Sequence, residues 1–233
     1  MTKKKEEVVA TEVNAPVENV TVASQPFDFE VFYEKNKSLI GKATIAVAGA
    51  VALFFGGKYY LNSQNEEAQE KMFQAQFYFK SDSLDLALNG KGKDRGFLQI
   101  KDQYPMTDAA NLASYYAGVI YLQKGEFKKA IDQLSDFSSK DALVQARAYS
   151  LIGDANMELN NFADAKTYYS KAAEYKPNKD FTPEYLYKLA IACEKAKDNI
   201  AAVEAYSTII NEYPNSEKVL DAKKYRSLLE TQK

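Results

Sequence analysis

The hydrophobic pattern contains one long apolar stretch close to the N-terminus. No residue from 43 to 57 is charged, and across 39–61 the only charged residues are Lys42 and Lys58. A helix over 39–61 would be roughly 34 Å long, at about 1.5 Å per residue, and would cross a hydrocarbon core of about 30 Å. Tyr59 and Tyr60 close the stretch, as residues of an interfacial aromatic belt do. The pattern predicts a pre-membrane segment and a transmembrane helix over 29–61.

Two other interpretations of this stretch fit less well. A buried helix of a soluble protein seldom runs so far without a polar face. A cleaved signal peptide would need an unusually long leader before its apolar region. Lys35 and Lys37 precede the stretch, whereas Glu66 and Glu67 follow it. The positive-inside rule therefore predicts a single-pass protein with a cytoplasmic N-terminus and its C-terminal domain across the membrane.

The N-terminal residues 1–28 mix charged residues, small residues and isolated valines without helical periodicity. Such a segment cannot bury enough apolar surface to offset the entropy lost on ordering. We expect a disordered cytoplasmic tail.

Small residues share one face of the predicted membrane helix. Small side chains permit close approach of two helices in lipid, although the ordinary glycine and alanine content of membrane helices accounts for them equally well. The candidate helix-packing residues are Ala46, Gly49, Ala50 and Gly57.

Beyond the membrane stretch, a pattern recurs with a period of about 34 residues, the length of a tetratricopeptide repeat. Each unit of this kind is a pair of antiparallel helices, with small residues where the two helices cross closely. The unit that starts at Ala146 carries the pattern most fully, with Gly153 and Ala165 as its small pair and Pro177 near its end. The sequence therefore predicts an all-α fold, an N-terminal transmembrane helix followed by a tetratricopeptide-repeat solenoid.

Two neighbouring units repeat this arrangement. The unit from Asn111 has Gly118 and Ala130 as its small pair, and the unit that starts at Pro183 ends near Pro214. Thr182 before Pro183 is the expected N-cap of the third unit, since a hydroxyl cap followed by proline is a common helix opening. The three repeats and a C-terminal capping helix occupy residues 111–233.

The segments on either side complete the solenoid. Residues 62–105 are interpreted as a divergent helical repeat, in which 66–80 would extend the membrane helix outward and 97–104 would form a short return helix. Residues 216–229 predict the capping helix, whose apolar side chains would cover the last repeat. These side chains are Val219, Leu220, Tyr225, Leu228 and Leu229.

The amino-acid composition argues against several classes of function for this chain. The formal net charge of −2 lacks the basic excess of nucleic-acid-binding proteins. The chain contains no histidine, which removes the commonest general base and the commonest zinc ligand. The single cysteine, Cys193, falls at a packing position and is expected to be a buried thiol. We predict a non-catalytic protein without catalytic residues, metal, cofactor, small-molecule substrate or nucleic acid.

One glycine-rich basic segment, NGKGKDRG at 89–96, could suggest a phosphate site. A phosphate-binding loop requires G-x-x-x-x-G-K-[ST] between a strand and a helix. The spacing here differs and no strand is predicted before the segment, so we expect a mobile surface loop.

The first helices of successive units line the concave surface of such a solenoid. Here they carry apolar and aromatic side chains with an adaptable methionine, which suit an extended apolar segment or a partner helix, although several could instead pack against neighbouring repeats. The candidate groove residues are Leu112, Tyr115, Tyr116, Val119, Leu122, Arg147, Ser150, Leu151, Asp154, Met157, Glu184, Tyr187, Lys188 and Ile191.

The order of these features resembles the YfgM family. Phe32 and Asn36 form F-x-x-x-N ahead of the apolar stretch, glycines lie within the stretch, and Asn62-Ser63-Gln64 follow its aromatic end. Members of that family are ancillary subunits of the SecYEG translocon, with one inner-membrane helix and a periplasmic tetratricopeptide domain. The resemblance implies Sec translocon subunits, a membrane-tethered periplasmic chaperone and exported chains as partners, in the handing over of exported proteins.

The three units match the general repeat consensus more closely than expected of that family. A structural adaptor in cell-envelope assembly or cell division is therefore the alternative. An organellar import receptor would require the opposite topology.

Overall fold

The computed structural model describes residues 28–231, so nearly all of the predicted disordered tail lies outside the described residues. The first helix, α1, runs without a break from Phe29 to Lys80. The chain divides into two compact units, and the boundary falls within α1, after Leu53. Phe54 and the following part of α1 therefore belong to the same unit as the rest of the helices.

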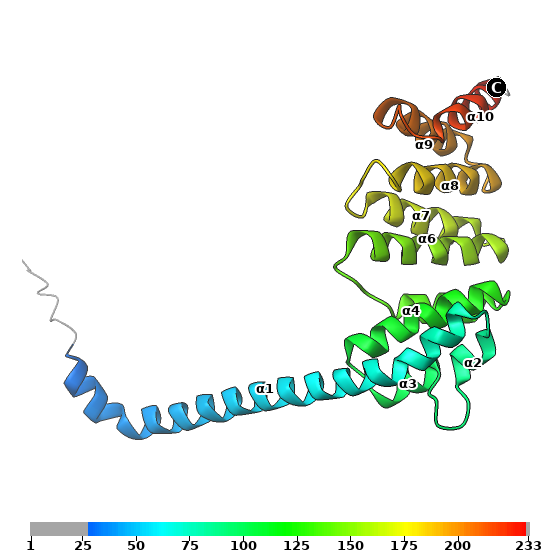
Figure 1. Cartoon of the computed structure of the whole chain (residues 1–233). Coiled ribbons are helices and arrows are strands. Elements are labelled where there is room, and N and C mark those ends of the chain that lie inside the picture. Colours follow the sequence, from blue (N-terminus) through cyan, green and yellow to red (C-terminus); the bar gives the residue numbers. More distant parts are fainter. Residues whose placement is uncertain (1–27, 232–233) are drawn as a thin grey trace, which may run out of the picture. The chain divides into compact units, whose positions relative to one another are not determined.

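The second unit is an all-helical solenoid, as predicted. Its helices from α4 onward stack in chain order, with α10 at the end opposite to α2 and α3 (Figure 1). The helices after α1 are α2 (Leu84–Asn89), α3 (Phe97–Gln103), α4 (Asp108–Gln123), α5 (Phe127–Ser135), α6 (Ala142–Glu158), α7 (Phe162–Glu174), α8 (Thr182–Lys195), α9 (Asn199–Glu212) and α10 (Val219–Glu230).

Small residues sit where the two helices of a unit cross. A Cβ atom added to Gly118 of α4 would lie 2.5 Å from Cγ of Leu134 in α5. One added to Gly153 of α6 would lie 2.6 Å from the ring of Tyr169 in α7. Only glycine permits these approaches with the neighbouring side chain in place, because real Cβ contacts are longer.

The C-terminal part of α1 belongs to the solenoid core. Ala68, Met72 and Ala75 are buried in one cluster with Phe97 and Ile100 of α3. The helix that contains the predicted membrane stretch therefore ends inside the first layer of the solenoid.

Two hydrogen bonds fix α1 to its neighbours just beyond the apolar stretch. The Asn65 side chain accepts from the backbone N–H of Ala109 at the start of α4, with an N–O distance of 2.9 Å. The Tyr104 hydroxyl donates to the carboxylate of Glu67 at 2.9 Å. Burial raises the Tyr104 pKa, and the bond to Glu67 raises it further, so the phenol remains a donor.

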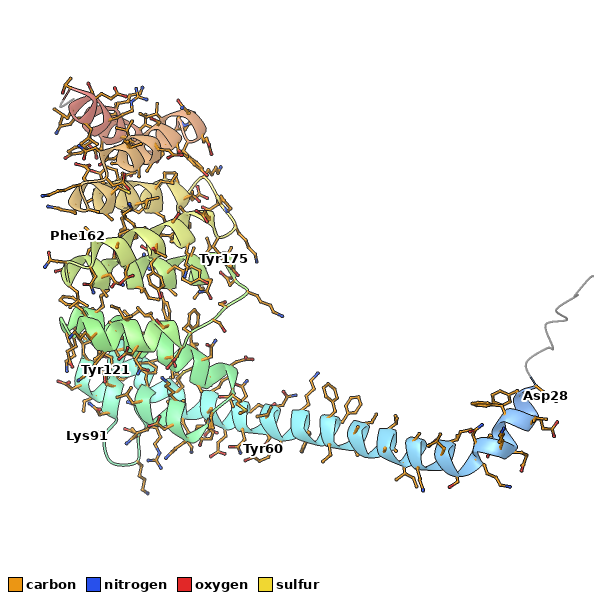
Figure 2. All side chains as sticks on the ribbon, turned by 180° about the vertical axis from the view of Figure 1, so that it is seen from behind. Asp28, Tyr60, Lys91, Tyr121, Phe162 and Tyr175 are labelled. Carbon is orange, nitrogen blue, oxygen red and sulfur yellow. The ribbon has the colours of Figure 1, made fainter. Side chains whose placement is uncertain are left out.

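The segment between α1 and α3 differs from the prediction. The short helix α2 was not expected, because six residues are too few for helical periodicity to be visible. The loop at 89–96 contains a turn in which Lys91 and Asp94 exchange two backbone hydrogen bonds of 3.0 Å, and its mobility stays a prediction. The Tyr78 hydroxyl donates to the Asp94 carboxylate at 2.9 Å. Figure 2 shows Lys91 on this loop.

Two details of the helix ends also differ. Thr182 is the first residue of α8 rather than its N-cap, and its hydroxyl accepts from the backbone N–H of Asn178 at 2.8 Å. In α10, Val219 and Leu229 cover the last repeat, but Leu220 and Leu228 are exposed. Val219, Ala222, the half-buried Tyr225 and Leu229 recur every three to four positions, which turns those two leucines away from the core.

Lysine–carboxylate pairs join each layer to the next. In the five long-range pairs among residues 28–231, the partners are separated by about one repeat length of 34 residues. They are partly exposed, so each contributes of the order of 0–1 kcal/mol to stability. The pairs are Lys101–Asp136, Lys124–Asp85, Lys166–Asp198, Lys188–Asp154 and Lys218–Glu184.

Candidate binding groove

A cavity of about 580 Å³ opens between the first helices of three successive units. Leu122 lines it from α4, Asp154 and Met157 from α6, and Lys188 and Ile191 from α8. All five are among the predicted groove residues. The fold thus brings together one side of three helices that are widely separated in sequence.

A charged pair forms part of the wall of this cavity. The Lys188 ammonium donates to both carboxylate oxygens of Asp154, at 2.8 and 2.9 Å, and lies 3.4 Å from the Ser150 hydroxyl. The Tyr169 hydroxyl donates to Asp154 Oδ1 at 2.7 Å. Burial raises the Tyr169 pKa well above its ordinary value, and the neighbouring Asp154 carboxylate adds to the shift. The phenol is therefore a neutral donor that holds the carboxylate in place.

Five lining residues were missed by the sequence analysis. Gln123 ends α4, Gly125 follows it, Phe127 opens α5 and Glu158 ends α6. The fifth, Tyr169, belongs to the second helix of its unit, which the sequence analysis did not assign to the groove. Its ring passes over Gly153, which has no side chain, and so reaches the inner surface. The glycine at the crossing was the only sequence signal that could have indicated this.

Several predicted groove residues of α4 pack within the solenoid instead. Tyr116 stacks on Phe97 with ring centroids 4.8 Å apart, and its edge meets Phe79 at 5.3 Å. Leu112 packs against the same cluster. Tyr115 lies 5.1 Å from the Phe137 ring, between centroids. Tyr116 and Leu112 therefore close the boundary between the first unit and the helices that precede it, whereas Tyr115 contacts the segment after α5.

The predicted groove residues between α4 and α6 also pack within the solenoid. Val119 packs, with Tyr115 and Leu122, around the buried Leu151 of α6, and Ser150 is also buried. Neither Leu151 nor Ser150 is open to a partner. Arg147 is exposed, and its guanidinium opposes the rise in Tyr115 pKa that burial causes.

The remaining predicted residues of α8 face the C-terminal cap. The Glu184 carboxylate pairs with Lys218 at 2.6 Å. The Tyr187 ring lies 5.9 Å from Tyr206 and 6.3 Å from Tyr225, between centroids. These two residues therefore join α8 to α9 and α10.

The small residues predicted for membrane packing are exposed on α1. Ala46 and Ala50 are open to the surroundings, and a Cβ atom added to Gly49 or Gly57 would meet nothing within 4 Å. Their role in helix pairing stays a prediction.

A second cavity, of about 540 Å³, lies between α7, α8 and α9. Cys193 lies in its wall but is buried, as expected from the sequence, and burial raises the pKa of its thiol. In the described range 28–231, no three His, Cys, Asp or Glu side chains are grouped so that they could hold a metal ion.

Comparison with known families identifies the repeats. Two family profiles, each described as "Tetratricopeptide repeat", match residues 146–179 and 184–216. These ranges coincide within one residue with the starts of the second and third predicted units. No curated protein is similar enough to the chain to be counted as a relative. The chain thus contains two tetratricopeptide repeats, which indicate a protein-interaction scaffold.

Proposed function

We propose that this chain is a membrane-anchored, non-catalytic scaffold that binds segments of partner proteins in the groove between α4, α6 and α8. The observation that carries this proposal is the meeting of Leu122, Met157 and Ile191 in one cavity around the Lys188–Asp154 pair. Apolar walls with a fixed polar centre suit an amphipathic helix or an extended segment. Met157 adds adaptability, because its unbranched thioether can fill irregular gaps.

The anchor is α1. It is long and apolar enough to cross a membrane, and its apolar window is not buried by other parts of the described chain. Leu53 and Phe54 are among its large exposed apolar residues. An exposed apolar surface of this length is unfavourable in water and favourable in a bilayer. We assign the N-terminus to the cytoplasm and the repeat domain to the periplasm, on the charge bias around the span.

For the partner, we propose the Sec translocon together with a membrane-tethered periplasmic chaperone, to which exported chains are handed over. The support for this finer assignment is the sequence around the membrane stretch, in particular Phe32, Asn36 and Asn62 to Gln64. The groove chemistry agrees with it, because an exported chain presents extended apolar segments before it folds.

The test is site-specific photocrosslinking in intact cells. A photoreactive residue at Met157 or Ile191 should capture exported chains or the chaperone. The matched control is Ala163, which is exposed on the second helix α7 of the same unit and does not line the cavity. Equal products from Met157 and Ala163 would contradict the groove assignment.

Purification of the tagged chain in a mild detergent identifies the membrane partner. Recovery of Sec subunits above an unrelated single-span control supports the translocon assignment. Recovery of cell-division or envelope-assembly proteins without Sec subunits would instead favour a structural adaptor in those processes.

A further inference from the structure

We propose that the turn between α3 and α4 inserts Met106 into the phospholipid headgroup region where α1 leaves the bilayer. The inference rests on the proposed function in one respect, since it requires α1 to span a membrane. It goes further because it gives the repeat domain a second lipid contact outside the membrane helix.

The turn lies beside the end of the apolar stretch. A cavity of about 490 Å³ separates α1 from the turn, and its α1 wall includes Phe54, Gly57 and Leu61. Met106 and Thr107 form the opposite wall. All of these residues belong to one compact unit, so their arrangement is a property of that unit. Met106 therefore lies at the level of α1 where the apolar stretch ends.

The tip of this turn is unusually apolar for a solvent-facing turn. Met106 is 90% exposed, and Pro105 beside it is also exposed. On α1 the adjacent aromatic residues Tyr59 and Tyr60 are 79% and 62% exposed. Figure 2 shows Tyr60 on the part of α1 that leads into the solenoid. Tyrosines with such exposure at the end of an apolar helix are typical of the interface between membrane and water.

The backbone of Met106 is held in an unfavourable conformation. Its φ is +65°, a left-handed value that glycine and asparagine adopt more readily than methionine. The turn is fixed on both sides, because the Thr107 hydroxyl donates to the Tyr104 carbonyl at 2.8 Å and accepts from the Ala110 N–H at 3.1 Å. What distinguishes Met106 from the other non-glycine residues with positive φ is its apolar and highly exposed side chain, which the rigid turn holds out for a contact outside the chain.

Phospholipid is the occupant that the surroundings favour. The cavity continues the apolar surface of the membrane helix, and an acyl chain beside Phe54 and Leu61 would extend into it. Lys58, in the same lining, offers an ammonium group to a lipid phosphate, while Asp108 is the one acidic residue there. The thioether of Met106 suits the boundary between headgroups and acyl chains, where apolar side chains gain from partial burial.

The test exploits a property of the composition. The chain contains no tryptophan, so Met106→Trp introduces a single reporter. The full-length variant is placed in liposomes of phosphatidylethanolamine and phosphatidylglycerol, with and without lipids brominated on their acyl chains. Bromine quenches tryptophan at short range, so we expect Met106→Trp to lose roughly half of its emission or more if its ring lies at the interface. The matched control is Ile200→Trp, at a residue of α9 that is 82% exposed.

The outcomes separate the inference from the proposed function. Quenching of Met106→Trp without quenching of Ile200→Trp supports the lipid contact. If the chain floats with the liposomes but both variants are quenched alike, or neither is, the lipid contact is wrong and the anchor stands. If the chain does not float with liposomes, the anchor itself is wrong and the inference fails with it.

A second variant guards against misfolding at the strained position. Met106→Cys in a Cys193→Ala background is labelled with an environment-sensitive dye. The emission of the dye should shift to the blue in liposomes relative to its emission in lipid-free buffer. A dye at Ile200→Cys in the same background should not shift. A dye spectrum at Met106 that matches the Ile200 spectrum in liposomes would overturn the inference.

Discussion

Lys188 of α8 and Asp154 of α6 form a salt bridge of 2.8 Å that crosses the boundary between two repeat units inside the candidate groove. Both side chains are less than one third exposed, and Tyr169 donates to the same carboxylate. The pair therefore has two roles, to hold neighbouring units together and to set the polarity of the surface offered to a partner. Its stability role can be measured without knowing the partner.

Removal of the Asp154 side chain should cost more than removal of its charge. Asp154→Ala leaves the buried Tyr169 hydroxyl without an acceptor, whereas Asp154→Asn keeps an oxygen for it and loses only the ion pair. We expect the free energy of unfolding to fall by about 2–3 kcal/mol for alanine and about 1 kcal/mol for asparagine. Denaturant titration of the purified chain measures both values. Equal losses would mean that the Tyr169 hydrogen bond contributes little.

The helix crossing at Gly153 should not accept a large side chain. Gly153→Leu would press on the Tyr169 ring, and moving that ring breaks its bond to Asp154. We expect a loss of about 2–3 kcal/mol in the free energy of unfolding. Ala163→Leu, at an exposed position of the adjacent helix, should change it by about 0.5 kcal/mol or less. Similar unfolding midpoints for the two variants would contradict the close approach.

Stability should fall at alkaline pH because of two buried tyrosines. Burial raises the pKa of Tyr169 and of Tyr206, and hydrogen-bonded carboxylates of Asp154 and Glu194 raise them further. Above about pH 10 the unfolded chain loses these protons while the folded chain keeps them, so the free energy of unfolding falls with a slope of up to about 1.4 kcal/mol per pH unit for each tyrosine. Below about pH 10 neither tyrosine makes the free energy of unfolding depend on pH.

The variant Tyr169→Phe tests the predicted fall of stability at alkaline pH. The variant should be less stable near neutral pH, because it lacks the bond to Asp154, but its stability should decline less steeply above about pH 10. Denaturant titrations across the alkaline range, with tyrosinate absorbance as the protonation signal, measure the slope. A slope equal to that of the parent chain would show that Tyr169 ionises without unfolding.

The Cys193 thiol should react slowly while the chain is folded. It is buried between α8 and α9, and burial raises its pKa, so both access and thiolate fraction are low. A maleimide should label it much faster in denaturant than in buffer. Ile200→Cys, at an exposed position of α9, should be labelled at once and serves as the positive control. Rapid labelling of Cys193 in buffer would show that α8 and α9 separate readily.

The features that the sequence predicted well are those governed by local spacing. Gly153 lies at the helix crossing of its unit and Ala165 is fully buried, as the repeat period predicts for its small residues. The unbroken helix from the apolar stretch to Lys80 agrees with the absence of proline and glycine between residues 62 and 80. Helix α2 was missed, because its stability comes from the burial of Ala87 and Leu88 rather than from its own length.

The groove was predicted only in part, for a physical reason. Repeat positions indicate which face of a first helix points inward, but not how deeply neighbouring units interlock. Tyr116 and Leu151 therefore fill the boundaries between layers, while Met157 and Ile191 remain in the cavity. Tyr169 lines the cavity although it belongs to the second helix, because its side chain is long and Gly153, over which its ring passes, has no side chain. Neither residue alone predicts this arrangement.

The way in which α1 enters the solenoid determines how far the groove can reach. Asn65 and Glu67 are bonded to the start of α4 and to Tyr104 about one turn beyond Leu61, so no free chain separates the end of the apolar stretch from the first repeat layer. A domain on a flexible tether searches a wide volume, whereas here the part of α1 from Phe54 onward and the groove belong to one compact unit. Under the proposed anchoring, a partner in the same membrane would meet the groove at a higher effective concentration than a freely diffusing protein.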